Sequence, residues 1–327
     1  MLDAFTSPGQ FWRGNIHGHS TNSDGHLTPE QVCAAYHRQG YDFICLSDHF
    51  RPMFNYPVTD TTPFRENGFT TILGAEVHAP TTTRGVDWHI LAVGLPPDFP
   101  ATSDSETGLT LARRCAEAGA FVAVAHPAWY NLELEDALAL DAAHAVEVYN
   151  HTCGVRTARG DSFAMWDAML SAGRRVTGIA VDDSHWHADA PDAFGGWVMV
   201  KAEENDPELL LTALKEGRFY ASQGPEINEL RRVDDTLVIR TTPATEVIAV
   251  GPVAASELVH GTALTRATLP LEKFASAWCR VVVRDAARHE VERGLGRLVL
   301  ALVVVVVPID KVVVAHDERH TRQRRAR

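Results

Sequence analysis

A regular alternation of short apolar runs and amphipathic stretches between residues 14 and 222 constrains the fold of this chain more than any other feature. The apolar runs resemble buried strands in length and composition, and they lie at 42–47, 70–75, 88–93, 120–125, 145–149 and 176–181. Helical periodicity separates several of them, at 106–118, 132–142, 161–172 and 207–216. Strands that alternate with helices are typical of a parallel sheet or a barrel, so we predict an α/β domain.

The first helix of this domain carries its own start signal. In the segment Thr28-Pro29-Glu30-Gln31, a threonine at the N-cap, a proline in the first turn and a glutamine three residues after the cap make up a capping box. We expect this helix to run to Gly40.

The pattern changes after Pro225, where short alternating strands replace the strand–helix alternation. Strands are predicted at 237–240, 247–250 and 278–283, which indicates a small β domain. We therefore divide the chain into a barrel domain at 1–225, a small β domain at 226–285 and a tail at 286–327. The tail contains ten consecutive apolar residues at 298–307, and we expect it to be a poorly ordered segment prone to aggregation.

Charge argues against nucleic acid as a partner. The 30 lysines and arginines face 42 aspartates and glutamates, and the net charge of −12 should repel a phosphate backbone. With 45% hydrophobic residues in 327, the composition is that of an ordinary globular protein. We expect a small molecule as the binding partner, while the sequence does not indicate the oligomeric state.

The cysteines and the apolar segments indicate the compartment. Five cysteines without a C-x-x-C pair argue against a disulfide framework and against a cysteine zinc site. The first fifteen residues contain no apolar run of signal-peptide length, and the run at 298–307 is too short to span a bilayer. We therefore expect a soluble, cytoplasmic protein without a membrane partner.

Residues that can bind metals or substrate follow most of the predicted strands. They are His17, His19, Asp48, His49, Glu76, His126, Asn150, His151, Asp182 and Asp183. The carboxyl ends of the strands form the rim on which (β/α) barrels build their active sites. The sequence therefore predicts one site at this rim.

The pair His17-x-His19 is weak evidence when taken alone. A chain with this histidine content is expected to contain roughly one such pair by chance, and a second pair occurs at His185-x-His187. Alternate side chains of a strand point the same way, however, so both imidazoles of the first pair can reach one ion. Asp24 lies in the loop just beyond.

Several motifs in a fixed order give the chain a family resemblance. They are HGHSTNSDGHLTPEQV from His17, LSDHF at 46–50, Glu76 after a strand, His89 in WHILAVG, AHPAW at 125–129 and DDSH at 182–185. Together they resemble the PHP (polymerase and histidinol phosphatase) superfamily over about residues 12–225. The resemblance implies a distorted (β/α)7 PHP barrel with a centre of two or three divalent metal ions at its rim.

The same resemblance implies which residues hold the ions. One ion would be bound by His17, His19, Glu76 and Asp183. A second would share Glu76 with His89 and His126, and a third would use Asp24, His49 and His185. Glu76 and Asp183 would also serve as the catalytic residues that orient the attacking hydroxide.

The residue types are chemically consistent with these roles. Imidazoles and carboxylates suit Zn, Mn or Fe(II) and do not choose between them. Two such ions about 3.5–4 Å apart lower the pKa of a bridging water and stabilise the leaving oxygen, so no serine or cysteine nucleophile is needed.

The segment LKEGRFYASQGPEI at 214–227 and the following β domain resemble the CehA/McbA-like branch of the superfamily. This implies a metal-dependent hydrolase, and we expect a phosphoesterase for a small phosphorylated substrate. The alternatives are a carbamate, amide or carboxylic ester hydrolase on the same metals, or a non-catalytic metal-binding or accessory module.

Two ligand positions and the substrate contacts stay open at this point. His78 competes with His89 as the partner of Glu76, and Asp182 competes with Asp183, although the D-x-H spacing favours Asp183. Three further residues could contact substrate, namely Asn150, His151 and Arg156, the last by pairing with an anionic group.

Overall fold

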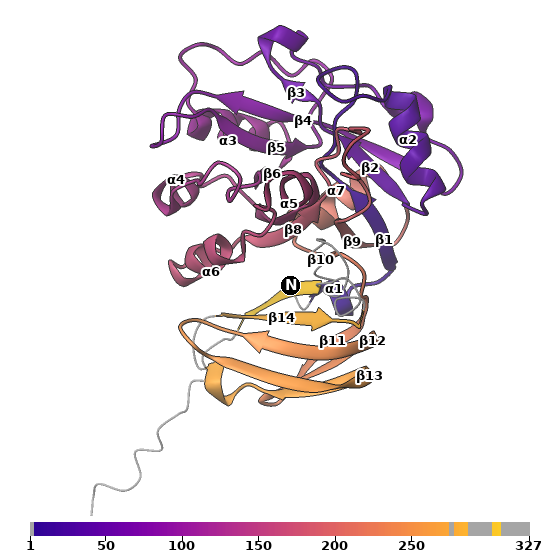
Figure 1. Ribbon diagram of the computed structural model, residues 1–327, viewed down its shortest axis with the longest axis vertical. Coiled ribbons are helices and arrows are strands. Elements are labelled where there is room, and N and C mark those ends of the chain that lie inside the picture. The colour runs from indigo at the N-terminus through magenta and orange to yellow at the C-terminus, as the bar shows by residue number, and fades with distance from the viewer. Residues whose placement is uncertain (1–2, 275–277, 287–302, 309–327) are drawn as a thin grey trace, which may run out of the picture.

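The computed structural model describes residues 3–274, 278–286 and 303–308. Figure 1 shows a barrel-like sheet with helices on its outer face above a second, smaller sheet. This arrangement confirms the predicted α/β barrel followed by a small β domain.

Seven strands form the barrel, in the order β1, β2, β4, β5, β6, β7 and β8. Their bounds are β1 Gln10–Asn15, β2 Phe43–Leu46, β4 Thr70–Ala79, β5 Trp88–Val93, β6 Phe121–Val124, β7 Ala145–Asn150 and β8 Thr177–Val181. Neighbours pair in parallel except β5, which runs antiparallel to both β4 and β6. A short strand β3 (His49–Phe50) extends the sheet beside β4. The reversed β5 is the distortion of this barrel.

The helices connect and cover these strands. They are α1 Asp3–Thr6, α2 Pro29–Arg38, α3 Gly108–Glu117, α4 Leu134–Ala139, α5 His151–Thr157, α6 Phe163–Ser171 and α7 Pro207–Lys215. Three short 3-10 turns are η1 Pro52–Phe54, η2 Thr62–Phe64 and η3 Glu272–Phe274. The predicted capping box is present in α2, because the hydroxyl of Thr28 accepts from the amide of Gln31 and the Gln31 side chain accepts from the amide of Thr28. The helix ends at Arg38, two residues before the predicted Gly40.

Three strands join the barrel to the β domain. Strand β9 (Trp197–Ala202) pairs antiparallel with β1, and β10 (Phe219–Ser222) pairs antiparallel with β9. Strand β15 (Val303–Pro308) lies between β10 and the β domain. The predicted domain boundary at 225 falls in the connection between β10 and the next strand.

The small β domain consists of long antiparallel strands. They are β11 Ile227–Val233, β12 Thr236–Val250, β13 Ser256–Pro270 and β14 Trp278–Arg284. The two strands predicted at 237–240 and 247–250 are parts of the single strand β12, whose pairing with β13 shifts register between Arg240 and Glu246. The strand predicted at 278–283 is β14.

Part of the predicted tail belongs to the sheet. Residues Val303–Pro308 form β15, which pairs antiparallel with β14 along its length and with β10 at Val304. Successive valines favour the extended backbone, which explains the strand in what we expected to be a poorly ordered segment. The rest of the predicted tail, 287–302 and 309–327, lies outside the described residues.

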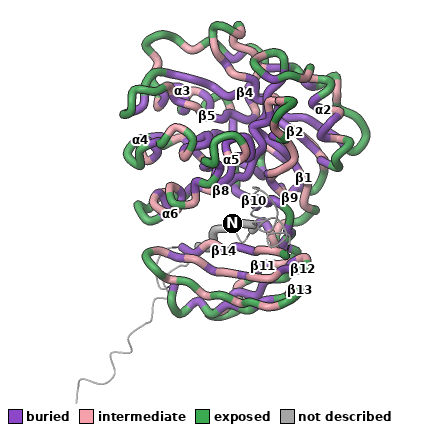
Figure 2. The backbone as a smooth tube through the Cα atoms, viewed as in Figure 1, coloured by how far each residue is buried: buried purple, intermediate pink, exposed green. Residues whose placement is uncertain are grey.

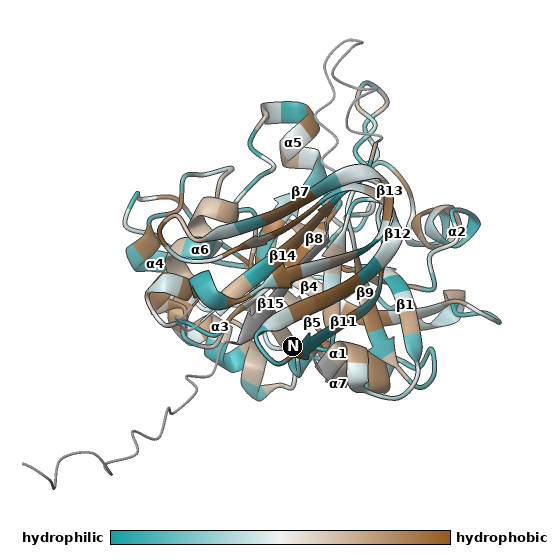
Figure 3. Ribbon diagram, turned by 90° about the horizontal axis from the view of Figure 1, so that it is seen from below, coloured by the Kyte–Doolittle hydropathy of each residue, from teal (hydrophilic) through white to brown (hydrophobic). Residues whose placement is uncertain are grey.

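Burial follows the strands. Figure 2 shows the barrel strands almost entirely buried, while exposed residues gather on the helices and loops. Seen from below, the central strands are largely hydrophobic and the surrounding helices carry hydrophilic residues outward (Figure 3). Among the described helices, none has the length and apolarity needed to cross a membrane.

Candidate metal centre

The barrel closes where the chain continues past β1 and β8. The amide of His19 donates to the carbonyl of Ser184 at 2.9 Å, and the amide of Asp183 donates to the carbonyl of His17 at the same distance. A parallel bridge between Gly18 and Ser184 lies between these bonds. The His-x-His and Asp-x-His segments, about 165 residues apart in sequence, are thereby adjacent at the rim.

Glu76 lies at the centre of the site. Its side chain is fully buried in β4. One oxygen, Oε2, lies 2.6 Å from Nδ1 of His49. The other, Oε1, lies 2.7 Å from Nδ1 of His89 and 3.1 Å from Nε2 of His126. A single carboxylate is thus in contact with imidazoles from three different elements.

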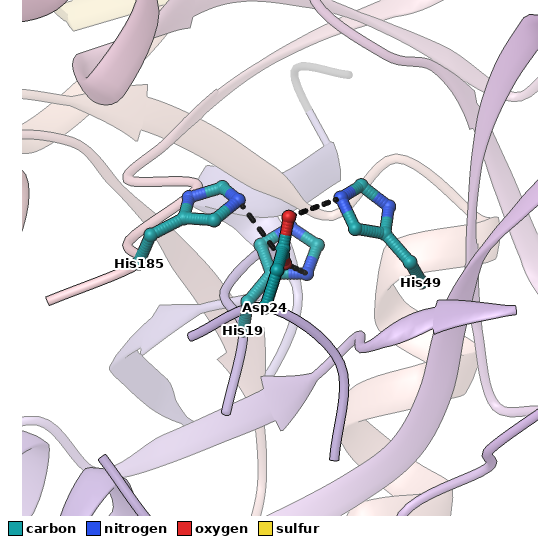
Figure 4. Close-up of side chains that lie close together, drawn as sticks. All are labelled: His19, Asp24, His49 and His185. Carbon is teal, nitrogen blue, oxygen red and sulfur yellow. Dashed lines mark ion pairs between the residues drawn. The ribbon is translucent and has the colours of Figure 1, made fainter. Parts of the chain in front are cut away.

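Asp24 gathers a second group of imidazoles at the mouth of the site. Its carboxylate oxygens lie 3.4 Å from Nε2 of His49, 3.5 Å from Nε2 of His185 and 4.0 Å from Nδ1 of His19. Figure 4 shows the three rings converging on this carboxylate from three sides. The four side chains could hold one ion between them.

Asp183 connects the first two histidines. Its Oδ1 lies 2.9 Å from Nε2 of His19 and 3.3 Å from Nε2 of His17. The neighbouring Asp182 has a different task, because its carboxylate accepts from the amides of residues 194–196 and from the hydroxyl of Tyr36. The geometry therefore places Asp183, and not Asp182, among the donors that face one another.

All nine predicted ligands come together in one cluster. Five overlapping groups have ligand atoms within 4.8 Å of one another: His19, Asp24, His49 and His185; His17, His19 and Glu76; His17, His126 and Asp183; His49, Glu76 and His78; Glu76, His89 and His126. The expected second set is one of these groups. The set expected for the third ion, Asp24, His49 and His185, is found with His19 added. The set expected for the first ion is divided between the group of His17, His19 and Glu76 and the group of His17, His126 and Asp183.

His78 and His89 both lie beside Glu76, but their surroundings differ. A guanidinium nitrogen of Arg51 lies 3.1 Å from Nδ1 of His78. The same Nδ1 lies 3.2 Å from the carbonyl oxygen of Trp88, and Nε2 faces Nδ1 of His49 at 2.9 Å. Nδ1 of His89 faces Oε1 of Glu76 at 2.7 Å. Each of the two histidines belongs to one candidate ligand group, so both are placed to bind an ion beside Glu76.

The charges of the cluster act strongly on one another. Burial opposes protonation of His49, yet the carboxylates of Glu76 and Asp24 more than offset it and raise its pKa to about 10. Burial and the neighbouring His185 and His49 lower the pKa of His19 to about 4. Burial opposes ionisation of Glu76, but the imidazoles around it, foremost His49 and His89, hold its pKa well below the usual range. The site thus keeps carboxylates ionised beside imidazoles that repel one another when charged.

Three buried ligand atoms have no hydrogen-bond partner among the described residues. They are Nε2 of His17, Nδ1 of His126 and Oε2 of Glu76, the last of which lies 2.6 Å from Nδ1 of His49 without hydrogen-bond geometry. An unsatisfied buried polar atom costs about 1–3 kcal/mol, and three such atoms in one cluster are what ligands of a cation would leave. The imidazole and carboxylate donors suit zinc, manganese or iron, so the residues present fit the expected metal centre.

The cluster forms the floor of a cavity of about 270 Å³. The side chains of Trp129 and Arg156 line its walls, together with residues of α5. Arg156 is the one predicted substrate contact on this cavity. Asn150 is buried and caps α5 by accepting from the amide of Cys153, and His151 bonds to Tyr149 and to the carbonyl of Pro191.

Two residues behind the ligands, which are not among the nine predicted ligands, hold them in place. Glu147 of β7 contacts His17, and Asp48 accepts from the side chains of Ser20, Ser23 and Thr59, which fixes the loop that carries Asp24. A lone acid in the otherwise apolar and aromatic run 145–149 was a signal for Glu147. Asp48 follows its strand directly beside His49, so the sequence marks the position but not the hydrogen bonds.

Three known structures match this chain, and one of them shares the fold over nearly its whole length. A two-domain protein from Bacteroides vulgatus, described as containing a predicted PHP-like metal-dependent phosphoesterase, matches 92% of this chain and 97% of its own length with 18% identity and a TM-score of 0.50. A metal-dependent phosphoesterase candidate from Bifidobacterium adolescentis also matches, with 17% identity over 53% of this chain and 87% of its own length and a TM-score of 0.40. An amidohydrolase from Chromobacterium violaceum matches with 13% identity over 63% of this chain and 96% of its own length and a TM-score of 0.45. No family model and no curated protein matches the sequence.

The likeness to the Bacteroides protein extends over nearly the whole of both chains, including the small β domain. At 18% identity it establishes the fold, which is a PHP barrel followed by a small β domain. The activity has to be argued from the side chains of the site.

Proposed function

We propose that this protein is a metal-dependent hydrolase that cleaves a small phosphoester with two or three divalent ions at the rim cluster. The observation that carries the proposal is the convergence of nine imidazole and carboxylate side chains in one cluster, seven of which line the cavity. Three buried ligand atoms in this cluster make no hydrogen bond among the described residues. Bound ions would supply a Lewis acid, an acidified water and charge neutralisation at the leaving oxygen.

Side chains of the protein would hold the ions and orient the attacking water. Glu76 would hold two ions in fixed relation, because its two oxygens face different imidazoles. Asp183, beside His17 and His19, would orient the attacking water by accepting a hydrogen bond from it. Against the effect of burial, the neighbouring His17 and His19 lower the pKa of Asp183, which keeps this carboxylate an acceptor.

The cavity supports a small anionic substrate. Its volume of about 270 Å³ fits a small molecule and not a polymer. Arg156 reaches this cavity, and its nearest acidic partner, Asp189, is largely exposed at 3.6 Å. A pair so exposed is weak, so the guanidinium is free to exchange it for a phosphate oxygen.

We also propose the finer features that the sequence suggested. The ions would be zinc, manganese or iron, the chain would belong to the CehA/McbA-like branch, and it would act in the cytoplasm on a small molecule. The five buried, unpaired cysteines are consistent with a reducing compartment.

A panel of chromogenic phosphate, acetate and carbamate esters tests the proposal with metal-loaded protein. We expect phosphate ester cleavage that is lost in Glu76→Ala and in His17→Ala, while the exposed His260→Ala serves as the matched control and retains activity. If only the carbamate or acetate esters are cleaved, the protein is the alternative carbamate or carboxylic ester hydrolase, acting through the same metal centre. Full activity of Glu76→Ala, or of rigorously metal-free protein, would overturn metal-dependent hydrolysis.

A further inference from the structure

Glu147 is a fully buried acid whose carboxylate faces the cluster from behind. It belongs to β7 and is not among the nine candidate ligands. Its Oε1 lies 2.6 Å from Nδ1 of His17. Its Oε2 accepts from the backbone amide of His126 at 2.8 Å and from the side-chain amide of Asn150 at 3.0 Å. Both oxygens are therefore engaged within the protein.

The contact with His17 fixes the tautomer of that ring. An ionised carboxylate only accepts, so Nδ1 of His17 carries the proton and donates to Glu147. The lone pair of Nε2 then points to the other side of the ring. There it lies 3.3 Å from Oδ1 of Asp183, with no hydrogen-bond partner among the described residues.

The other oxygen of Glu147 acts on two more ligands. His126 has a positive φ of 25°, which is uncommon for a residue with a side chain, and the bond from its amide to Glu147 holds this backbone in place. Asn150 donates to Glu147 and also to Oδ2 of Asp183 at 3.0 Å. The orientation of the Asp183 carboxylate is thus tied to Glu147 through one amide group.

The three side chains that Glu147 reaches form one of the candidate ligand groups. His17, His126 and Asp183 have ligand atoms within 4.8 Å of one another. The group centred on Asp24 shares none of these three residues. His17 also belongs to the group with His19 and Glu76, and His126 to the group with Glu76 and His89. One buried carboxylate therefore supports the ligands at the inner end of the cluster and contacts none of the group centred on Asp24.

We propose that Glu147 is a positioning residue that sets the orientation of His17, His126 and Asp183, and thereby the metal affinity of the groups to which these three residues belong, while the group centred on Asp24 is unaffected. The inference rests on the proposed metal dependence. Outer carboxylates of this kind orient metal-binding imidazoles and make them more basic.

Glu147→Gln is the direct test, because it keeps the shape and removes the charge. The glutamine side chain has one acceptor oxygen where the carboxylate has two, so its NH₂ group must face either the His17 proton or the two amide donors. In Zn²⁺ titrations of metal-depleted protein against a chromogenic chelator, we expect at least one equivalent to bind about 10- to 100-fold more weakly. The equivalent bound by the group centred on Asp24 should keep the wild-type affinity. Glu147→Asp keeps the charge and should recover part of the loss.

Asp136→Asn is the matched control. Asp136 is also a buried carboxylate that accepts from a backbone amide and a hydroxyl, both of Thr83, but it is in none of the ligand groups. Thermal unfolding of the metal-free variants measures the structural cost of each change, and zinc affinity measures the positioning role.

Three results would overturn the inference. Wild-type zinc affinity in Glu147→Gln at every position would do so, as would equal weakening at all positions or the same zinc loss in Asp136→Asn. If Glu147→Gln fails to fold, the zinc affinity of Glu147→Asp decides, and a wild-type value there counts against the inference. Absence of zinc, manganese and iron binding by the wild-type protein would instead remove the proposed function itself.

Discussion

Nε2 of His19 lies 2.9 Å from Oδ1 of Asp183, although 164 residues separate them in the chain. The contact exists because the segments after β1 and β8 bond to each other and close the barrel. The two halves of the proposed metal centre are therefore assembled by the fold, and by thermodynamic linkage the ions should in turn stabilise the fold.

Removal of metal should lower the unfolding temperature. An ion present at 100 times its dissociation constant adds about 2.7 kcal/mol to the free energy of unfolding. We expect a chelator to lower the midpoint by several degrees in differential scanning calorimetry, and excess Zn²⁺ or Mn²⁺ to restore it. The variant His19→Ala should show a much smaller chelator effect. Identical midpoints with and without chelator would contradict the link between closure and metal binding.

Asp182 and Asp183 should respond differently to the same substitution. Asp183→Asn should lose bound metal and activity, because it removes a charged donor that faces two imidazoles. Asp182→Asn should retain metal but destabilise the fold by about 1–3 kcal/mol, since its carboxylate accepts several buried hydrogen bonds. Metal analysis and urea denaturation of both variants distinguish the two effects. Metal loss from Asp182→Asn alone would reverse the assignment.

The Asp-x-His and Glu76 positions could be predicted from sequence because each lies in or next to a clear apolar strand, and the His-x-His pair could be predicted from the order of the motifs. The antiparallel direction of β5 could not be predicted, because the direction of a strand depends on its pairing partners and not on its composition. His89 lies near the start of β5, and it reaches the rim only because β5 runs antiparallel to β4. Sequence reasoning that expects ligands at strand ends finds His89 through the motif order alone.

The hydrogen bonds that support the ligands from behind could not be predicted from the sequence either. Glu147 and Asp48 act through partners that are distant along the chain, such as His17, which is 130 residues from Glu147. Nothing local distinguishes a buried acid that supports a histidine from one that caps a turn. Strand β15 was missed for a related reason, since its partners β10 and β14 lie elsewhere in the sequence.

Gly25 should be essential for the position of Asp24. A Cβ atom at Gly25 would lie 2.6 Å from the carbonyl carbon and oxygen of His19, so the backbone would have to move. We expect Gly25→Ala to weaken metal binding at the group of His19 and Asp24, measured by zinc titration. Gly154→Ala is the control, because the nearest atom to its Cβ is 3.4 Å away. Equal zinc affinity in both variants would show that the loop adapts.

The β domain should be held to the barrel by a partly buried ion pair. Arg280 of β14 contacts Asp167 of α6 through two bonds of 2.7 and 2.9 Å, with side chains 12 and 30% exposed, and its guanidinium also lies over the ring of Phe163. Two-point pairing of this kind is stronger than a single exposed contact. In a double-mutant cycle of Arg280→Met and Asp167→Asn, we expect a coupling of about 1–2 kcal/mol in urea denaturation.

The comparison pair for this cycle is Arg113 with Asp141, which has similar distances but lies within the barrel domain with both side chains about half exposed. Water and salt screen such a pair, so its coupling should be smaller and should fall further at high salt. Loss of the Arg280 pair should also separate the unfolding transitions of the two domains, because it removes a contact between them. Equal coupling for both pairs, or a single unchanged transition in Arg280→Met, would show that this ion pair does not hold the two domains together.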